Sequence, residues 1–314
     1  MRTIGTSPLR IHPLCLGANP FGWTADRVAT EAILDAFLEG GGNFVDTADS
    51  YSSWVPGNRG GESETFIGAW MAARKNRSKL VIATKVGGHP EFQGLSPKVI
   101  AAAADASLSR LRADVIDLYY AHHDDGVTPI EEISVAFDGL VRAGKVRAVG
   151  ISNLSAERIE GWLRVARAEG HALPVALQPA YSLVDRANFE RNLAPIASRE
   201  GLSVFPYPAL ASGFLTGKYR KAGDAQGAAR GGSVARFFTP EGFGVLDALD
   251  EVAAAHRSTP TSVALAWLLA KPTIGAPIAS VSRKEQLAAL LAAPGLALTA
   301  EELARLDCAS ASFA

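Results

Sequence analysis

Cysteine is scarce in this sequence, and neither sign of charge is in excess. Only two cysteines occur in 314 residues, Cys15 and Cys308. A disulfide framework is therefore not expected to stabilise the fold, and a reducing compartment is the better prediction. The 31 Lys and Arg residues nearly cancel the 32 Asp and Glu residues. This balance gives no general electrostatic reason to bind nucleic acid or an anionic membrane surface.

Long hydrophobic runs and targeting patterns are also missing. No apolar stretch reaches the roughly 20 residues that a membrane-spanning helix needs, and the N-terminal residues lack the pattern of a signal peptide. Hydrophobic residues make up 48% of the chain, which is enough for one large core. We therefore expect a cytoplasmic globular protein. No shift in composition divides the chain, so a single domain over residues 1–314 is predicted.

Short apolar runs alternate with longer amphipathic segments along the chain. Several of the runs are continuous rather than alternating, which is typical of strands buried on both faces of a parallel sheet. The eight predicted strands are Leu14–Gly17, Asn43–Asp46, Val81–Lys85, Ile116–His122, Val146–Ile151, Val175–Gln178, Leu202–Tyr207 and Ala276–Ser280.

The amphipathic segments carry start and stop signals for helices. Asp26 can cap a helix that ends at Gly40, and Ser96 precedes a first-turn proline. Ser155 can cap a helix that runs to Gly170. Three further segments have the S/T-x-x-E pattern of a capping box: 128–131, 282–285 and 299–302.

Eight strand–helix units in about 300 residues predict an α/β fold, a (β/α)8 TIM barrel with extra C-terminal helices. An open doubly wound sheet is the alternative. The first dozen residues are expected to form a β-hairpin that closes one end of the barrel. The segment Leu210–Gly244 is rich in glycine, alanine and basic residues and is predicted to be a long functional loop.

Polar residues follow the predicted strands, and in a parallel barrel these ends meet at one mouth. A buried Lys85 would need a partner, which Asp46 can provide from a neighbouring strand. The Lys85 ammonium beside Tyr51 would lower the pKa of the phenol, and His122 could orient a carbonyl oxygen. These four residue types form a centre that can protonate a carbonyl oxygen while the carbonyl carbon is attacked. Ser152, Asn153, Gln178 and Tyr207 end the later strands.

Other chemical motifs do not fit. Residues 40–42 lack the G-x-G-x-x-G spacing of a dinucleotide turn, residues 213–218 are too short for a P-loop, and no G-x-S-x-G elbow occurs. His122, His123, Asp124 and Asp125 are adjacent, so their side chains cannot all face one ion. We expect no metal site, although a metal-dependent barrel hydrolase using both histidines is an alternative.

With these residues in this order, the sequence resembles the aldo-keto reductase superfamily over nearly the whole chain. It is most similar to bacterial members near the channel beta-subunit-like branch. Each matching segment is short, but together their order and spacing make a chance match very unlikely. The segments are LCLG at 14–17, GNFVDTADSY at 42–51, ATK at 83–85, DLYYAH at 117–122, GKVRAVGISN at 144–153 and LTGKY at 215–219.

The resemblance implies a catalytic tetrad of Asp46, Tyr51, Lys85 and His122, in which Tyr51 is the general acid. It also implies an extended nicotinamide cofactor bound without a Rossmann domain, NADPH being favoured over NADH. The implied cofactor-binding residues are Ser152, Asn153, Gln178, Tyr207, Leu210, Ser212, Leu215, Lys218, Ser280, Ser282, Arg283 and Gln286. Four residues near the barrel mouth are candidates for substrate binding: Trp23, Trp54, His89 and Phe92.

The function implied is NADPH-dependent reduction of an aldehyde or ketone to an alcohol. The expected partner is a small carbonyl compound, with no nucleic acid and no membrane, and a homo-oligomer is compatible with the sequence. The alternative is a nucleotide-sensing regulatory subunit with little turnover, since some members of the superfamily serve ion channels in this way.

Overall fold

The computed structural model describes residues 1–314, apart from the side chain of Ala222. Its centre is an eight-stranded parallel sheet with the order β11-β10-β9-β8-β5-β4-β3-β12. All eight predicted strands are present. Their bounds are β3 Cys15–Gly17, β4 Phe44–Asp46, β5 Val81–Val86, β8 Ile116–Ala121, β9 Val146–Ser152, β10 Pro174–Gln178, β11 Ser203–Val204 and β12 Ile278–Ala279.

The two outer strands meet, which closes the sheet. Val204 of β11 forms a parallel bridge with Ile274, four residues before β12. The Gly275 N–H donates to the Val204 carbonyl at 2.8 Å, and the Ile278 N–H donates to the Pro206 carbonyl at 3.0 Å. The fold is therefore the predicted (β/α)8 TIM barrel rather than an open doubly wound sheet.

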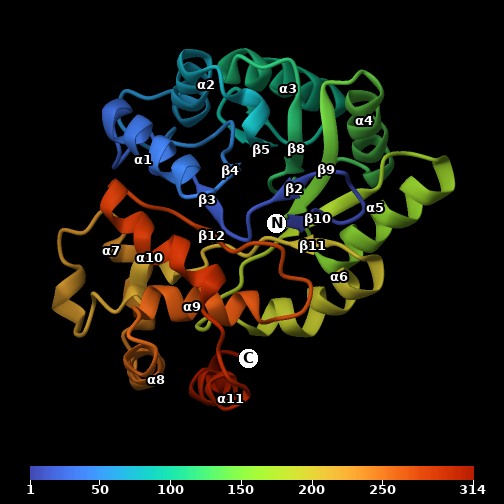
Figure 1. The fold of residues 1–314 in the computed structure, drawn as a ribbon. Coiled ribbons are helices and arrows are strands. Elements are labelled where there is room, and N and C mark those ends of the chain that lie inside the picture. Colours follow the sequence, from blue (N-terminus) through green and yellow to red (C-terminus); the bar gives the residue numbers. More distant parts are fainter.

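Helices surround the barrel, as Figure 1 shows. None of the described helices is both long enough and apolar enough to cross a bilayer. Two short antiparallel hairpins accompany the barrel, β1 Arg2–Thr3 with β2 Arg10–Ile11, and β6 Gly88–His89 with β7 Phe92–Gln93. The helices are α1 Arg27–Glu39, α2 Glu62–Arg74, α3 Pro97–Leu111, α4 Ile130–Arg142, α5 Ala156–Glu169, α6 Ala194–Glu200, α7 Gly231–Val234, α8 Pro240–Ala255, α9 Pro260–Leu269, α10 Leu287–Ala292 and α11 Ala300–Ala309.

Most of the predicted helix caps are confirmed. Asp26 accepts from the N–H of Ala29 at 2.8 Å at the start of α1, and Ser96 and Ser155 cap α3 and α5 in the same way. Thr299 forms the predicted capping box at the start of α11. Each such cap satisfies backbone N–H groups that have no partner within the helix, a contribution of about 1 kcal/mol.

Two predicted caps are wrong. The Thr128 hydroxyl donates to Asp125 at 2.6 Å instead of accepting from the first turn of α4. Ser282 does not cap a helix either: the Gln286 side chain accepts from the backbone N–H groups of Ser282 and Arg283, at 2.9 and 3.2 Å. Both patterns fail because the helical segment begins one residue later than the pattern implies: the N-caps are Pro129 and Arg283. The predicted long loop is also too long, since α8 begins at Pro240.

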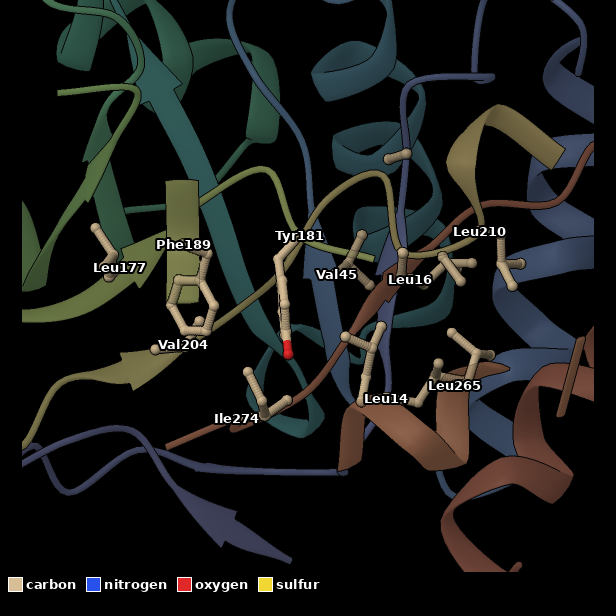
Figure 2. Packing of buried hydrophobic residues seen from close by; sticks show 14 of the residues in the cluster. Leu14, Leu16, Val45, Leu177, Tyr181, Phe189, Val204, Leu210, Leu265 and Ile274 are labelled. Carbon is tan, nitrogen blue, oxygen red and sulfur yellow. The ribbon is translucent and has the colours of Figure 1, made fainter. Parts of the chain in front are cut away.

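Apolar side chains fill the barrel and the layer between barrel and helices. Ile4, Leu9 and Ile11 of the N-terminal hairpin join the interior cluster, so the hairpin closes one end as predicted. Figure 2 shows part of the outer layer, where Val45 of β4 and Leu265 of α9 belong to one cluster. Three fully buried tryptophans anchor this outer layer, as expected for helical positions: Trp70, Trp162 and Trp267.

Candidate active site

A buried ion pair lies at the centre of the candidate site. Lys85 of β5 and Asp46 at the end of β4 are 0% and 1% exposed, and the Lys85 Nζ lies 2.6 Å from Asp46 Oδ2. Lys85 also donates to the Thr47 carbonyl oxygen at 2.6 Å and to the Tyr51 hydroxyl oxygen at 2.9 Å. An ammonium group has three N–H donors, so every one is used and its position is fixed.

Asp46 is held from a second direction as well. The Gln178 amide at the end of β10 donates to Asp46 Oδ1 at 2.8 Å. The Tyr51 hydroxyl lies 3.4 Å from Asp46 Oδ2, which makes a long and weak hydrogen bond. The Tyr51 oxygen therefore accepts from Lys85, while its own proton has no strong acceptor among the residues that the structure describes.

The pKa values at this centre follow from burial and from the ion pair. Burial raises the pKa of Tyr51 to about 12, because the attraction of Lys85 for the phenolate only partly offsets the loss of water. This differs from the sequence-based expectation of a lowered value. Burial alone would lower the pKa of Lys85, but the Asp46 carboxylate reverses this and raises it. Tyr51 is thus protonated and Lys85 charged near neutral pH.

His122 follows β8 and lies beside Tyr51. The centroids of the two rings are 6.1 Å apart, and His122 stacks on His123 at 4.2 Å. Burial lowers the pKa of His122 well below its usual value, and the charge of Lys85 adds to this effect. The imidazole is therefore neutral, and it can donate only one N–H.

A cleft of about 240 Å³ opens next to Tyr51. Half of the predicted site residues line it: Asp46, Tyr51, Gln178, Tyr207, Leu210, Ser212, Lys218, Ser280, Ser282 and Gln286. The other half do not line it: Trp23, Trp54, Lys85, His89, Phe92, His122, Ser152, Asn153, Leu215 and Arg283.

Some residues outside the lining hold those inside it. Ser152 donates to the Gln178 carbonyl oxygen at 2.9 Å. The Asn153 amide donates to the His122 carbonyl oxygen at 2.8 Å, and its oxygen accepts from the Tyr207 hydroxyl. This network links the ends of β8, β9 and β10 into one rigid edge. Leu215 is fully buried in the hydrophobic core, and Arg283 is exposed.

The candidate substrate residues form two separate pairs. Trp23 and Trp54 meet edge to face at 5.7 Å, and Trp54 is 50% exposed and lies 6.3 Å from the Tyr51 ring. His89 and Phe92 pack on each other at 5.2 Å in the β6–β7 hairpin, where His89 is 3% exposed. The tryptophan pair is thus beside the cleft residue Tyr51, whereas His89 is enclosed.

Sequence reasoning missed several residues of the cleft, of which Arg230 is the most informative. Its guanidinium donates to Asn19 at 3.1 Å and lies over the Trp23 ring at 5.5 Å. Burial lowers the pKa of Arg230, and no carboxylate of the described residues pairs with it. The basic character of the predicted loop was a signal, but nothing in the sequence distinguishes Arg230 from its basic neighbours. Thr24, Asn19 and Tyr219 also line the cleft.

In the part of the chain that the structure describes, the two carboxylates of the His122–Asp125 segment make contacts that do not involve a metal site. Asp124 pairs with Arg158 at 2.8 Å, and Asp125 accepts from the Leu95 N–H at 2.8 Å. No group of three His, Cys, Asp or Glu side chains among the described residues is arranged to hold a metal ion.

Comparisons with known proteins match the chain to one family model and to several curated proteins. The model of the Aldo/keto reductase family matches residues 13–311. Norsolorinic acid reductase B of Aspergillus parasiticus is 34% identical, over 95% of this chain and 81% of its own length. The oxidoreductase YrpG of Bacillus subtilis is 35% identical, over 97% and 94%. An aryl-alcohol dehydrogenase of Pestalotiopsis microspora is 32% identical, over 96% and 79%.

Proposed function

The chain belongs to the Aldo/keto reductase family of oxidoreductases, and from this premise we propose that it reduces an aldehyde or ketone to an alcohol with NADPH. One observation carries the proposal: the Tyr51 hydroxyl lines the cleft and accepts from Lys85 at 2.9 Å, while its own proton is held only by the long hydrogen bond to Asp46, at 3.4 Å. A phenol in this position can give its proton to a carbonyl oxygen that enters the cleft.

The buried ion pair supports this role of Tyr51. When Tyr51 releases its proton, negative charge develops on the phenol oxygen, 2.9 Å from the Lys85 ammonium. A fixed charge in a shielded site stabilises such a developing charge without solvent reorganisation. Asp46 keeps Lys85 charged and in place. The pKa of Tyr51, raised to about 12 by burial, ensures that the proton is present before the reaction.

His122 is proposed to position the carbonyl group. Its neutral ring lies beside Tyr51, so one N–H can direct the carbonyl oxygen toward the Tyr51 hydroxyl without adding a competing positive charge. The Asn153 side-chain amide donates to the backbone carbonyl oxygen of His122 at 2.8 Å and so holds the backbone at His122 in place.

The residues of the cleft fit a nicotinamide dinucleotide. Lys218 and Arg230 line it, and neither is paired with a carboxylate among the described residues, which suits the negative pyrophosphate. Tyr207 offers an aromatic face and Gln178 an amide. The bound cofactor would supply the hydride that reduces the carbonyl carbon. Ser282 at the cleft and Arg283 beside it support NADPH over NADH.

Cytoplasmic localisation stays a prediction from the sequence.

An aromatic carbonyl compound is the proposed substrate class. Trp54 is half-exposed at 6.3 Å from the Tyr51 ring, and Trp23 supports it from the side. These two indole rings favour flat, apolar groups next to the reacting carbonyl. Similarity to norsolorinic acid reductases and to an aryl-alcohol dehydrogenase supports the same class.

The test is NADPH oxidation by the purified protein with a panel of aromatic and aliphatic aldehydes and ketones, including 4-nitrobenzaldehyde. We expect turnover with identified alcohol products, and faster rates for aromatic than for aliphatic carbonyls. Tight NADPH binding without turnover across the panel would refute the reductase proposal and favour the regulatory alternative. Turnover that does not favour aromatic compounds would refute only the substrate class.

A further inference from the structure

Asn58 links the two loops that carry the tryptophan pair, and the proposed proton transfer does not use it. It lies four residues after Trp54, on the loop between β4 and α2. Its side-chain amide nitrogen donates to the backbone carbonyl oxygen of Gly22 at 2.9 Å and to that of Ser52 at 3.1 Å. An amide nitrogen has two N–H donors, so both are used.

Both acceptors lie next to the indole rings along the chain. Gly22 directly precedes Trp23, so Asn58 bonds to the peptide group that joins these two residues. The Ser52 carbonyl oxygen also accepts from the backbone N–H of the third residue after it, at 3.1 Å, which closes the turn that contains Trp54. One side chain therefore holds the backbone at both tryptophans.

A further hydrogen bond and close packing hold the same loops together. Ser52 is buried, and its hydroxyl donates to the backbone carbonyl oxygen of Phe21 at 2.8 Å. A Cβ atom at Gly22 would lie only 2.8 Å from the Cβ of Glu62, the first residue of α2. Gly22 has a φ of 84°, which glycine adopts without strain. The loop that carries Trp23 is therefore fixed against the segment that follows β4.

The two indole rings lie beside the proposed acid. Trp54 is 6.3 Å from the ring of Tyr51 and meets Trp23 edge to face at 5.7 Å. Trp54 is 50% exposed, so half of its surface has no protein packed against it. The position of its backbone therefore decides where its ring lies relative to a carbonyl group at Tyr51.

We propose that Asn58 is a positioning residue that sets the preference for aromatic carbonyl compounds, because it holds both tryptophan rings in one arrangement beside Tyr51. The ring of such a substrate packs on the indoles while its carbonyl group meets the Tyr51 hydroxyl. A preformed arrangement binds this ring without the entropy loss of ordering two mobile loops. This role depends on the proposed reductase function and deepens its substrate class.

The substrate preference of Asn58→Asp tests this role. Aspartate has the same shape, but it lacks both N–H donors and places an oxygen against the carbonyl oxygens of Gly22 and Ser52. We expect kcat/KM for 4-nitrobenzaldehyde to fall by about 2-fold to 10-fold, the range for one aromatic contact, mainly through a higher KM. The loss for butanal should be smaller, so the ratio of the two values falls. Equal losses for both aldehydes would overturn the proposal.

A double-mutant cycle separates positioning of the rings from a general effect on the fold. In a Trp23→Ala, Trp54→Ala background both rings are absent. Adding Asn58→Asp to this background should then leave the ratio of the two kcat/KM values unchanged, since the residues act through one another. A further fall of the ratio, as large as in the wild-type background, would show that Asn58 acts by another route and would overturn the proposal.

Asn43→Asp is the matched control. Asn43 is also partly buried and also links two segments, because its amide donates to the Arg10 carbonyl oxygen at 2.9 Å and its oxygen accepts from the His12 N–H at 2.7 Å. It precedes β4, at the end of the barrel that the N-terminal hairpin closes. Asn43→Asp should keep the wild-type ratio, and a fall equal to that of Asn58→Asp would overturn the proposal.

A second variant tests the same link with a smaller change. Ser52→Ala removes only the hydrogen bond to Phe21 and should lower the same ratio in the same direction. It keeps the test decisive if Asn58→Asp does not fold. A Ser52→Ala protein with the wild-type ratio would count against the positioning of the rings by these loop contacts.

Amide hydrogen exchange separates this inference from the proposed function. In Asn58→Asp, exchange should become faster in residues 20–25 and 51–58 together, because local opening of the two loops becomes easier. Exchange at the wild-type rate in both segments would overturn the link. If the wild type reduced no carbonyl compound, the reductase function would be refuted and the role in substrate preference with it. The exchange rates would still decide whether Asn58 holds the two loops together.

Discussion

Replacing Lys85 by methionine would test the buried ion pair on which the candidate site is built. Methionine has a similar length and no charge, so the change removes the ammonium with little loss of volume. It would leave the Asp46 carboxylate, 1% exposed, with the Gln178 amide at 2.8 Å as its remaining close donor. Breaking a buried pair in this way costs about 3–5 kcal/mol, because the remaining charge has neither water nor a counter-ion.

That loss should be visible in thermal and denaturant unfolding. With an unfolding entropy of about 2.1 cal/mol/K per residue, a chain of 314 residues loses about 1.5 °C for each kcal/mol, so the melting temperature should fall by roughly 5–8 °C. Removing Asp46 as well, in the Asp46→Asn, Lys85→Met double variant, should restore much of the stability but no activity. Lys145→Met is the matched control, since Lys145 pairs with an exposed carboxylate, and it should cost less than about 1 kcal/mol. If Lys85→Met were as stable as the control, the reasoning would be refuted.

Two further predictions concern the cleft and the fold. Arg230→Ala should weaken NADPH binding by about 10-fold to 100-fold in a titration of protein fluorescence, because hydrogen bonds to charged groups contribute about 1.5–3 kcal/mol. Arg236→Ala is the control, at an exposed position outside the cleft, and it should bind NADPH normally. If the two variants bound NADPH equally well, Arg230 would not belong to the cofactor site. Gly68→Ala should destabilise the protein by about 1–3 kcal/mol or more, because the new Cβ would lie 2.2 Å from a backbone carbonyl oxygen of α3. Gly139→Ala, at a helical position with open space, should instead stabilise the protein by about 0.5–1 kcal/mol. If the two changes had similar effects on stability, the close packing at Gly68 would be contradicted.

The strands and most caps could be predicted because their signals are local. Continuous apolar runs identify buried parallel strands, and a residue such as Asp26 or Ser155 caps its own helix. At Thr128 and Ser282 the predicted caps are wrong by one residue, because the N-caps in the structure are Pro129 and Arg283. A four-residue pattern does not determine a helix boundary to within one residue.

The meeting of Asp46, Lys85 and Tyr51 could be predicted because the ends of parallel strands converge. The direction in which the pKa of Tyr51 shifts could not be predicted, because the sequence indicates which charges are near but not how much water the phenol loses on burial. Arg230 was missed for a related reason. It lies in an irregular segment, where no periodicity determines which side chain turns toward the cleft.

The central claim is that the Tyr51 hydroxyl gives the proton to the carbonyl oxygen. The most direct measurement is single-turnover reduction of an aromatic aldehyde by the NADPH-loaded Tyr51→Phe protein, with cofactor affinity measured alongside. The account predicts unchanged NADPH binding and a rate lower by about 100-fold to 10,000-fold, the range for loss of general acid catalysis. A Tyr51→Phe protein that binds NADPH normally and reduces the aldehyde at the wild-type rate would contradict it.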